Sequence, residues 1–121
     1  MGWIGVDLDG TLAEYHGWDG GIGKPIAPMV ERVKRWLAEG VEVRIMTARV
    51  SNRGGYSEES GRSADGAFVL EQRSMIQLWC WEHLGTPIPV TCEKDFRMVE
   101  LWDDRAVQVI PNTGLRADGG A

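Results

Sequence analysis

The most constraining feature of this sequence is the apolar run at residues 3–6, which is followed by two aspartates separated by one leucine. The run shows no polar alternation, a pattern typical of a central strand in a parallel sheet that is covered on both faces. Isolated buried charge is costly, or is neutralised by a shift in pKa. Asp7 and Asp9 therefore need a cation, hydrogen-bond donors or a reaction that uses them.

Helix-like and strand-like segments alternate along the rest of the chain. Apolar residues recur at helical spacing over residues 28–39 and again over 68–84. Further strand-like patterns occupy residues 41–47, 87–92, 99–102 and 106–110. This order predicts an α/β fold, a Rossmann-like three-layer sandwich with a mainly parallel five-stranded sheet and right-handed crossovers.

The size of the chain limits its domain organisation. It has 121 residues, of which 43% are hydrophobic, and this fits one compact domain. We expect that domain at residues 1–115. Residues 116–121, which hold glycines and no apolar anchor, are expected to form a frayed tail.

Charge and cysteine content exclude several classes of protein. A net charge of -5 with scattered Lys and Arg residues gives no basic surface for tight, sequence-independent DNA binding, although contact with one phosphorylated strand end stays open. Cys80 and Cys92 lack the density of a disulfide scaffold and the spacing of a zinc site. No apolar run approaches the roughly 20 residues of a membrane span, so we expect a cytoplasmic protein with no membrane contact.

Polar side chains gather where the predicted strands end. Ligands of open α/β sheets bind outside the carboxyl ends of the strands. Side chains at or just beyond these ends are Asp7, Asp9, Thr47, Lys94, Asp103 and Asp104. We therefore expect one site that draws on several strands.

The pair Asp7-x-Asp9, followed directly by Gly10 and Thr11, resembles the first motif of the haloacid-dehalogenase-like (HAD) hydrolase superfamily. The later motifs of the family follow in order at Thr47, Lys94 and the pair Asp103-Asp104. The resemblance spans residues 4–110 and implies a small phosphatase with a single catalytic domain and no cap domain. Since the dehalogenase members of the family lack an acid at the position of Asp9, the resemblance implies phosphoryl transfer in preference to cleavage of a carbon–halogen bond.

The resemblance also implies roles for the catalytic residues. Asp7 would be the nucleophile that forms an aspartyl-phosphate, and Asp9 the general acid and base. Thr47 would hydrogen-bond the transferred phosphoryl group. Lys94 would supply positive charge, although its neighbours Glu93 and Asp95 also suit a solvated surface lysine.

A metal ion and substrate contacts complete the implied site. Mg²⁺ prefers hard oxygen ligands, which Asp7 and Asp103 would supply directly, with the backbone carbonyl of Asp9 and, through water, Asp104. Substrate contacts are expected from Thr11, Ala48 and Arg49. For Arg49 a solvated side chain is an equal alternative.

Family members that act on small substrates often carry a cap domain, and this chain has no room for one. The two insertion points hold only residues 13–25 and 50–66, so we expect an open site, with the second segment as a mobile loop that sets substrate preference. An open site suits a nucleic-acid end, a phosphorylated protein, or a small substrate covered by the second subunit of a homodimer. The alternatives to a general phosphatase are a nucleotidase, a polynucleotide 3′-phosphatase, which the run Asp103-Asp104-Arg105 resembles, and a non-catalytic binder of a phosphorylated ligand.

Overall fold

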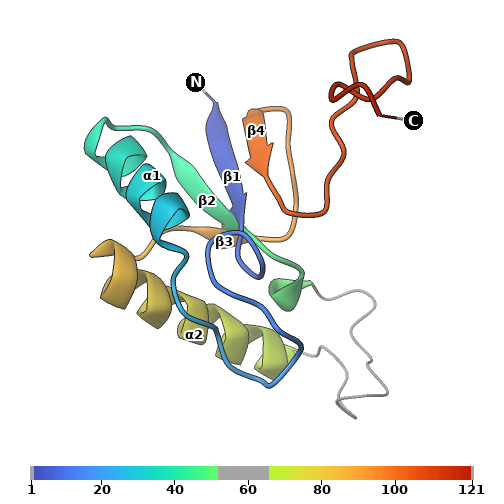
Figure 1. Cartoon of the computed structure of the whole chain (residues 1–121). Helices are drawn as coiled ribbons and strands as arrows, with labels where there is room; N and C mark the ends of the chain where they lie inside the picture. Colours follow the sequence, from blue (N-terminus) through green and yellow to red (C-terminus); the bar gives the residue numbers. More distant parts are fainter. Residues whose placement is uncertain (1, 52–65, 121) are drawn as a thin grey trace.

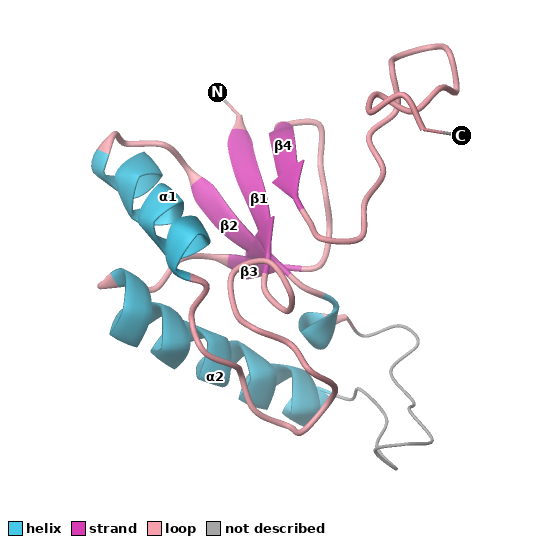
Figure 2. Ribbon diagram, in the orientation of Figure 1, coloured by secondary structure: helices cyan, strands magenta, loops and turns pink. Residues whose placement is uncertain are grey.

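The structure is a computed structural model that describes residues 2–51 and 66–120. These residues form an α/β fold with an open, fully parallel sheet and two helices (Figure 1, Figure 2). In chain order the elements are β1 (Trp3–Asp7), α1 (Ala27–Ala38), β2 (Val43–Met46), the short 3₁₀ helix η1 (Ala48–Val50), α2 (Gly66–Leu84), β3 (Val90–Thr91) and β4 (Met98–Trp102). The strand order in the sheet is β3-β2-β1-β4.

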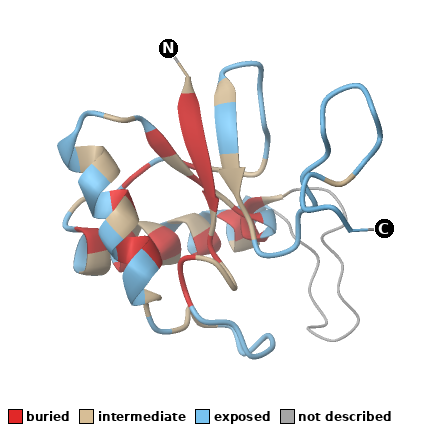
Figure 3. Cartoon of the chain, turned by 45° about the horizontal axis from the view of Figure 1, so that its top comes forward, coloured by how far each residue is buried: buried red, intermediate tan, exposed pale blue. Residues whose placement is uncertain are grey.

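Strand β1 lies in the middle of the sheet, as its apolar sequence predicts. Ile4 and Val6 belong to the main hydrophobic core, where they pair with Val43 and Ile45 of β2. On its other side β1 pairs with β4, and Val6 lies beside Trp102. Figure 3 shows β1 as a buried strand. The central position of β1 therefore places Asp7, its last residue, at the carboxyl end of the sheet, between β2 and β4.

Both helices pack on the same face of the sheet. Helix α1 has a proline in its first turn, ends before Gly40, whose φ is +81°, and buries Met29, Val30 and Val33. Helix α2 lies against α1 and buries an apolar face that includes Ile76. Because the chain steps from β1 to β2 to β3 in one direction with right-handed crossovers, both helices come to one side. Neither described helix is long and apolar enough to cross a membrane.

The prediction of five strands in a three-layer sandwich is wrong for the described part of the chain, which has four strands and one helical layer. Residues 106–110 form no strand, and among them only Val109 makes an isolated bridge, with Arg116. A second helical layer is also missing because the connection over residues 92–97 is too short for a helical crossover. The predicted strand over 87–92 shortens to β3.

The sheet face opposite the helices is covered by side chains. Trp3 points to this face and is fully buried. The guanidinium carbon of Arg44 lies 4.4 Å from the centre of a Trp3 ring, and the Trp3 indole nitrogen donates a 2.9 Å hydrogen bond to Asp95. The segment after β4 runs away from the sheet and is largely exposed (Figure 3). Fraying of residues 116–121 stays a prediction.

Candidate functional site

The candidate site lies where the order of the strands reverses. From β1 the chain moves to β2 and β3 on one side of the sheet, and then returns to β4 on the other side of β1. The carboxyl ends of β1 and β4 therefore flank a topological switch point, which is the usual ligand site of open α/β sheets. Asp7 is the last residue of β1, and Asp103 directly follows β4.

A tight turn after β1 fixes the position of Asp9. Leu8 and Leu12, on either side of the turn, are both fully buried and anchor it in the core. The carbonyl of Leu8 accepts hydrogen bonds from the amides of Leu12 (3.0 Å) and Ala13 (2.9 Å), and the amide of Gly10 donates to the carbonyl of Ala13 (2.8 Å). Asp9 is thereby held directly beside the end of β1.

Gly10 lets the turn approach the segment after β4 closely. Its φ is +90°, and a Cβ atom at this position would lie 2.5 Å from Oδ2 of Asp104. The Thr11 hydroxyl donates to Oδ1 of Asp104 over 3.3 Å. Thr11 thus contacts a carboxylate of the site, and its expected contact with substrate stays a prediction.

Three carboxylates converge at this point. Asp7, Asp103 and Asp104 each offer an oxygen, and these oxygens all lie within 4.8 Å of one another. Burial, a hydrogen bond with Asp104, and the charges of the neighbouring aspartates raise the pKa of Asp7 to about 7. This cluster of oxygen donors could hold a metal ion, whose charge would offset the repulsion among the carboxylates.

A cavity of about 440 Å³ lies beside the carboxylates. The predicted site residues that line it are Asp7, Asp9, Thr47, Ala48, Arg49 and Asp103. Thr47 follows β2 and is buried. Its hydroxyl oxygen accepts a 3.2 Å hydrogen bond from the amide of Arg49 and so caps the start of η1. The Thr47 hydroxyl can still donate its own proton to a ligand in the cavity.

Lys94 is exposed and is not among the described residues that line the cavity. Arg105, to which the sequence analysis gave no separate role, does line it. The amide of Arg105 donates to Oδ1 of Asp103 over 2.8 Å, so the turn after β4 places both residues. Among the described residues, the cationic side chains at the cavity are therefore Arg49 and Arg105.

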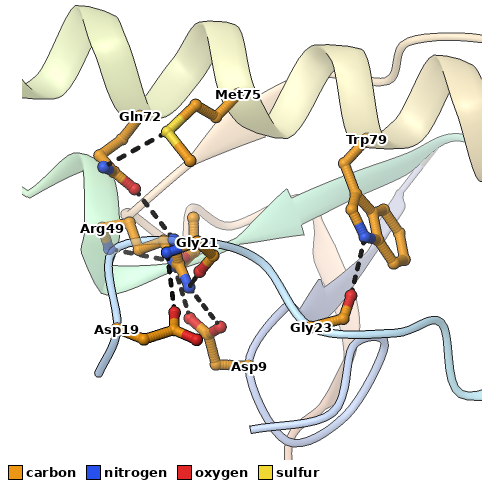
Figure 4. Close-up of polar contacts among 9 residues, drawn as sticks. Asp9, Asp19, Gly21, Gly23, Arg49, Gln72, Met75 and Trp79 are labelled. Atoms are coloured by element: carbon orange, nitrogen blue, oxygen red, sulfur yellow. Dashed lines mark hydrogen bonds and ion pairs between the residues drawn. The ribbon is translucent and has the colours of Figure 1, made fainter. Parts of the chain in front are cut away.

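Arg49 is buried, so the alternative of a solvated side chain is wrong. Its Nε and Nη2 atoms each donate a 2.8 Å hydrogen bond to the two carboxylate oxygens of Asp9 (Figure 4). Nη1 donates to Oε1 of Gln72 (3.1 Å), and Nη2 also donates to the carbonyl of Gly21 (2.7 Å). This network joins the turn after β1, the loop before α1, and α2.

Gln72 is a residue of this network that we did not predict from the sequence. It is 2% exposed, and its side-chain oxygen faces Arg49. The available signal was a polar residue on the otherwise apolar face of the predicted helix over 68–84, because a buried amide needs a polar partner. That signal indicates a buried contact and does not name the partner.

Comparison with known proteins assigns the chain to no family, since no family model and no curated protein matches it. A solved structure of a conserved protein from Bacteroides thetaiotaomicron is similar, with a TM-score of 0.56 and 22% sequence identity. The match covers 90% of this chain and 80% of that one. At this identity the likeness shows a shared fold alone.

Proposed function

We propose that this protein is a Mg²⁺-dependent phosphatase that hydrolyses a phosphate monoester through an aspartyl-phosphate on Asp7. The observation that carries the proposal is the convergence of the Asp7, Asp103 and Asp104 carboxylates at the switch point of the sheet. The cavity beside them, with Thr47 on its wall, offers space for a phosphoryl group. The resemblance of the sequence motifs to the HAD superfamily assigns the nucleophile and the acid–base residue.

The metal would be held by Asp7 and Asp103, with Asp104 contributing through water. When bound, Mg²⁺ supplies positive charge that offsets the repulsion between a carboxylate and a phosphate dianion. Arg105 lines the same cavity and enters no ion pair among the described residues, so it can add to this charge. The exposed position of Lys94 leaves it outside this proposal.

In the first half-reaction the Asp7 carboxylate attacks phosphorus, and the bond from phosphorus to the ester oxygen breaks. The leaving oxygen needs a proton, and Asp9 is the carboxyl group on the cavity wall that the resemblance assigns to this step. Both Asp9 oxygens accept from Arg49, so Asp9 must release at least one of these bonds and take up a proton before it can donate one to the leaving oxygen. Gln72 and Gly21 still hold Arg49 in that event.

In the second half-reaction a water molecule attacks the phosphorus of the aspartyl-phosphate. Asp9 takes a proton from this water, Asp7 is restored as a carboxylate, and inorganic phosphate is released. Proton uptake, like donation, requires Arg49 to release at least one Asp9 oxygen, while the remaining hydrogen bond keeps the carboxylate oriented. Thr47 can donate a hydrogen bond to a phosphoryl oxygen throughout.

The test is phosphate release from a generic aryl phosphate, with Mg²⁺ and with EDTA. We expect turnover by the wild type with Mg²⁺, none with EDTA, and none from Asp7→Asn, whose amide is not a competent nucleophile. Glu82→Gln, which removes an exposed charge on α2, is the matched control and should behave as wild type. Binding of a phosphorylated ligand without turnover would instead indicate the non-catalytic binder.

Two further expectations remain part of the proposal. A cytoplasmic location is supported by Cys80 and Cys92, which are both free thiols and so suit a reducing compartment. A homodimer whose second subunit covers the site would shield a small substrate from water. Analytical ultracentrifugation would test the second expectation.

A further inference from the structure

A second cavity, of about 250 Å³, adjoins the first one and shares Asp9, Tyr15 and Arg49 with it. We infer that this second cavity is the leaving-group pocket, and that it takes a nucleoside, which makes the substrate a nucleoside monophosphate. This inference rests on the proposed function and narrows its substrate class. Two cavity volumes of 440 Å³ and 250 Å³ suit one small ligand that spans both.

The position of Asp9 assigns the two cavities to the two halves of a substrate. The residue that protonates the leaving oxygen must lie within hydrogen-bond reach of it. Asp9 belongs to the walls of both cavities, whereas Asp7 lines only the first. A phosphoryl group next to Asp7 therefore places the alcohol half of the ester beyond Asp9, in the second cavity.

Trp18 gives this cavity a flat aromatic wall. The guanidinium carbon of Arg49 lies 4.7 Å from the centre of a Trp18 ring, so one face of the indole is covered. Because Arg49 is itself fixed by Asp9, Gln72 and Gly21 (Figure 4), the indole rests on a rigid support. Trp18 is still 42% exposed, which leaves aromatic surface for a base to stack on.

The polar groups of the second cavity favour a nucleoside over a second phosphate. Glu14 and Asp19 both line it, together with His16, whose Nε2 atom lies 3.2 Å from Oε1 of Glu14. Asp19 is fixed by a 2.8 Å hydrogen bond from the amide of Gly21. Carboxylates accept hydrogen bonds from sugar hydroxyls and base amino groups, and they repel additional phosphates. This wall is therefore unfavourable for a nucleic-acid strand, whose further phosphates would lie against it.

The first experiment compares kcat/KM for adenosine 5′-monophosphate and for glycerol phosphate, which has no ring. From the strength of base–aromatic stacking, Trp18→Ala should lower kcat/KM roughly 5- to 150-fold on the nucleotide and less than about twofold on glycerol phosphate. Trp18→Phe should retain most of the activity. Trp81→Ala, which removes an exposed indole outside both cavities, is the control. Equal losses on both substrates would overturn the inference.

The second experiment needs no phosphoryl chemistry. Saturation-transfer NMR should detect adenosine binding to the wild type and to Trp81→Ala, and its loss in Trp18→Ala. Absence of binding, or equal binding by all three proteins, would overturn the pocket whatever the activity. Adenosine binding that depends on Trp18, in a protein that hydrolyses no phosphate monoester with Mg²⁺, would refute the proposed function and leave the pocket standing.

Discussion

Binding of Mg²⁺ should depend steeply on pH, and the group responsible is Asp7. Burial and three neighbouring aspartates raise its pKa to about 7 in the metal-free protein. A metal ligand must be deprotonated, so each Mg²⁺ ion that binds below this pH displaces a proton from Asp7. The affinity for Mg²⁺ should therefore fall as the pH drops through 7, and it should level off at higher pH.

The size of the effect follows from the ionised fraction of Asp7. This fraction is about 90% at pH 8 and about 3% at pH 5.5 for a pKa of about 7. Apparent affinity scales with the competent fraction, so the dissociation constant for Mg²⁺ should rise about 30-fold over this range. About half a proton should be released per Mg²⁺ ion at pH 7 and nearly one at pH 5.5.

Isothermal titration calorimetry in two buffers of different ionisation enthalpy measures both quantities. In Asp104→Asn, which removes a hydrogen bond and a charge that raise the pKa of Asp7, the midpoint should move to lower pH. Burial, the largest cause, stays in place, so the midpoint should remain above the ordinary value of 3.8. Glu82→Gln should leave the curve unchanged. An affinity that is constant from pH 5.5 to 8, or binding without proton release, would show that Asp7 does not control Mg²⁺ binding.

Two other variants test the contacts around the site. Arg49→Met should lower the free energy of unfolding in urea by about 2–4 kcal/mol, somewhat less than for a fully buried pair because the Asp9 side chain is 21% exposed. Arg35→Met, at the exposed end of α1, should change the free energy by no more than about 0.5 kcal/mol. Gly10→Ala should weaken Mg²⁺ binding, since its Cβ would displace Asp104, whereas Gly20→Ala, with nearly the same φ and open space around it, should not. Equal effects of the two glycine changes in calorimetric titrations would show that the close approach of Gly10 to Asp104 is not needed for Mg²⁺ binding.

Elements whose ends carry local sequence signals could be predicted from the sequence alone. The helix predicted at 28–39 is observed as Ala27–Ala38, because a proline opens it and Gly40 follows its end. The predicted strand at 106–110 is absent, although Val107, Val109 and Ile110 are apolar. A strand needs a partner edge that a local pattern does not reveal, and these three side chains are instead exposed.

In the site too, features set by local sequence could be predicted, whereas contacts set by tertiary packing could not. The convergence of Asp7 and Asp103 could be predicted because Asp7 ends one strand and Asp103 follows another, and the carboxyl ends of parallel strands lie on the same side of the sheet. The pairing of Asp9 with Arg49 and Gln72 could not be predicted, because it depends on how α2 docks beside η1. The shape of the second cavity depends on the path of the loop before α1. The glycines in this loop allow many backbone conformations, so the sequence pattern does not predict that path.

The most direct test of the central claim is to look for a phosphoryl group on Asp7. Asp9 serves both half-reactions, so Asp9→Asn should slow formation of the intermediate as well as its hydrolysis. An aryl phosphate, whose leaving oxygen needs no proton, should still form the intermediate, and acid quenching after mixing with it and Mg²⁺ should trap the phosphorylated protein. Peptide mapping by mass spectrometry is then expected to find one phosphoryl group on Asp7, and none in a protein that carries Asp7→Asn as well. Phosphate release by the wild type with no phosphorylated Asp7 at any quench time, or with the phosphoryl group on another residue, would show that Asp7 is not the nucleophile.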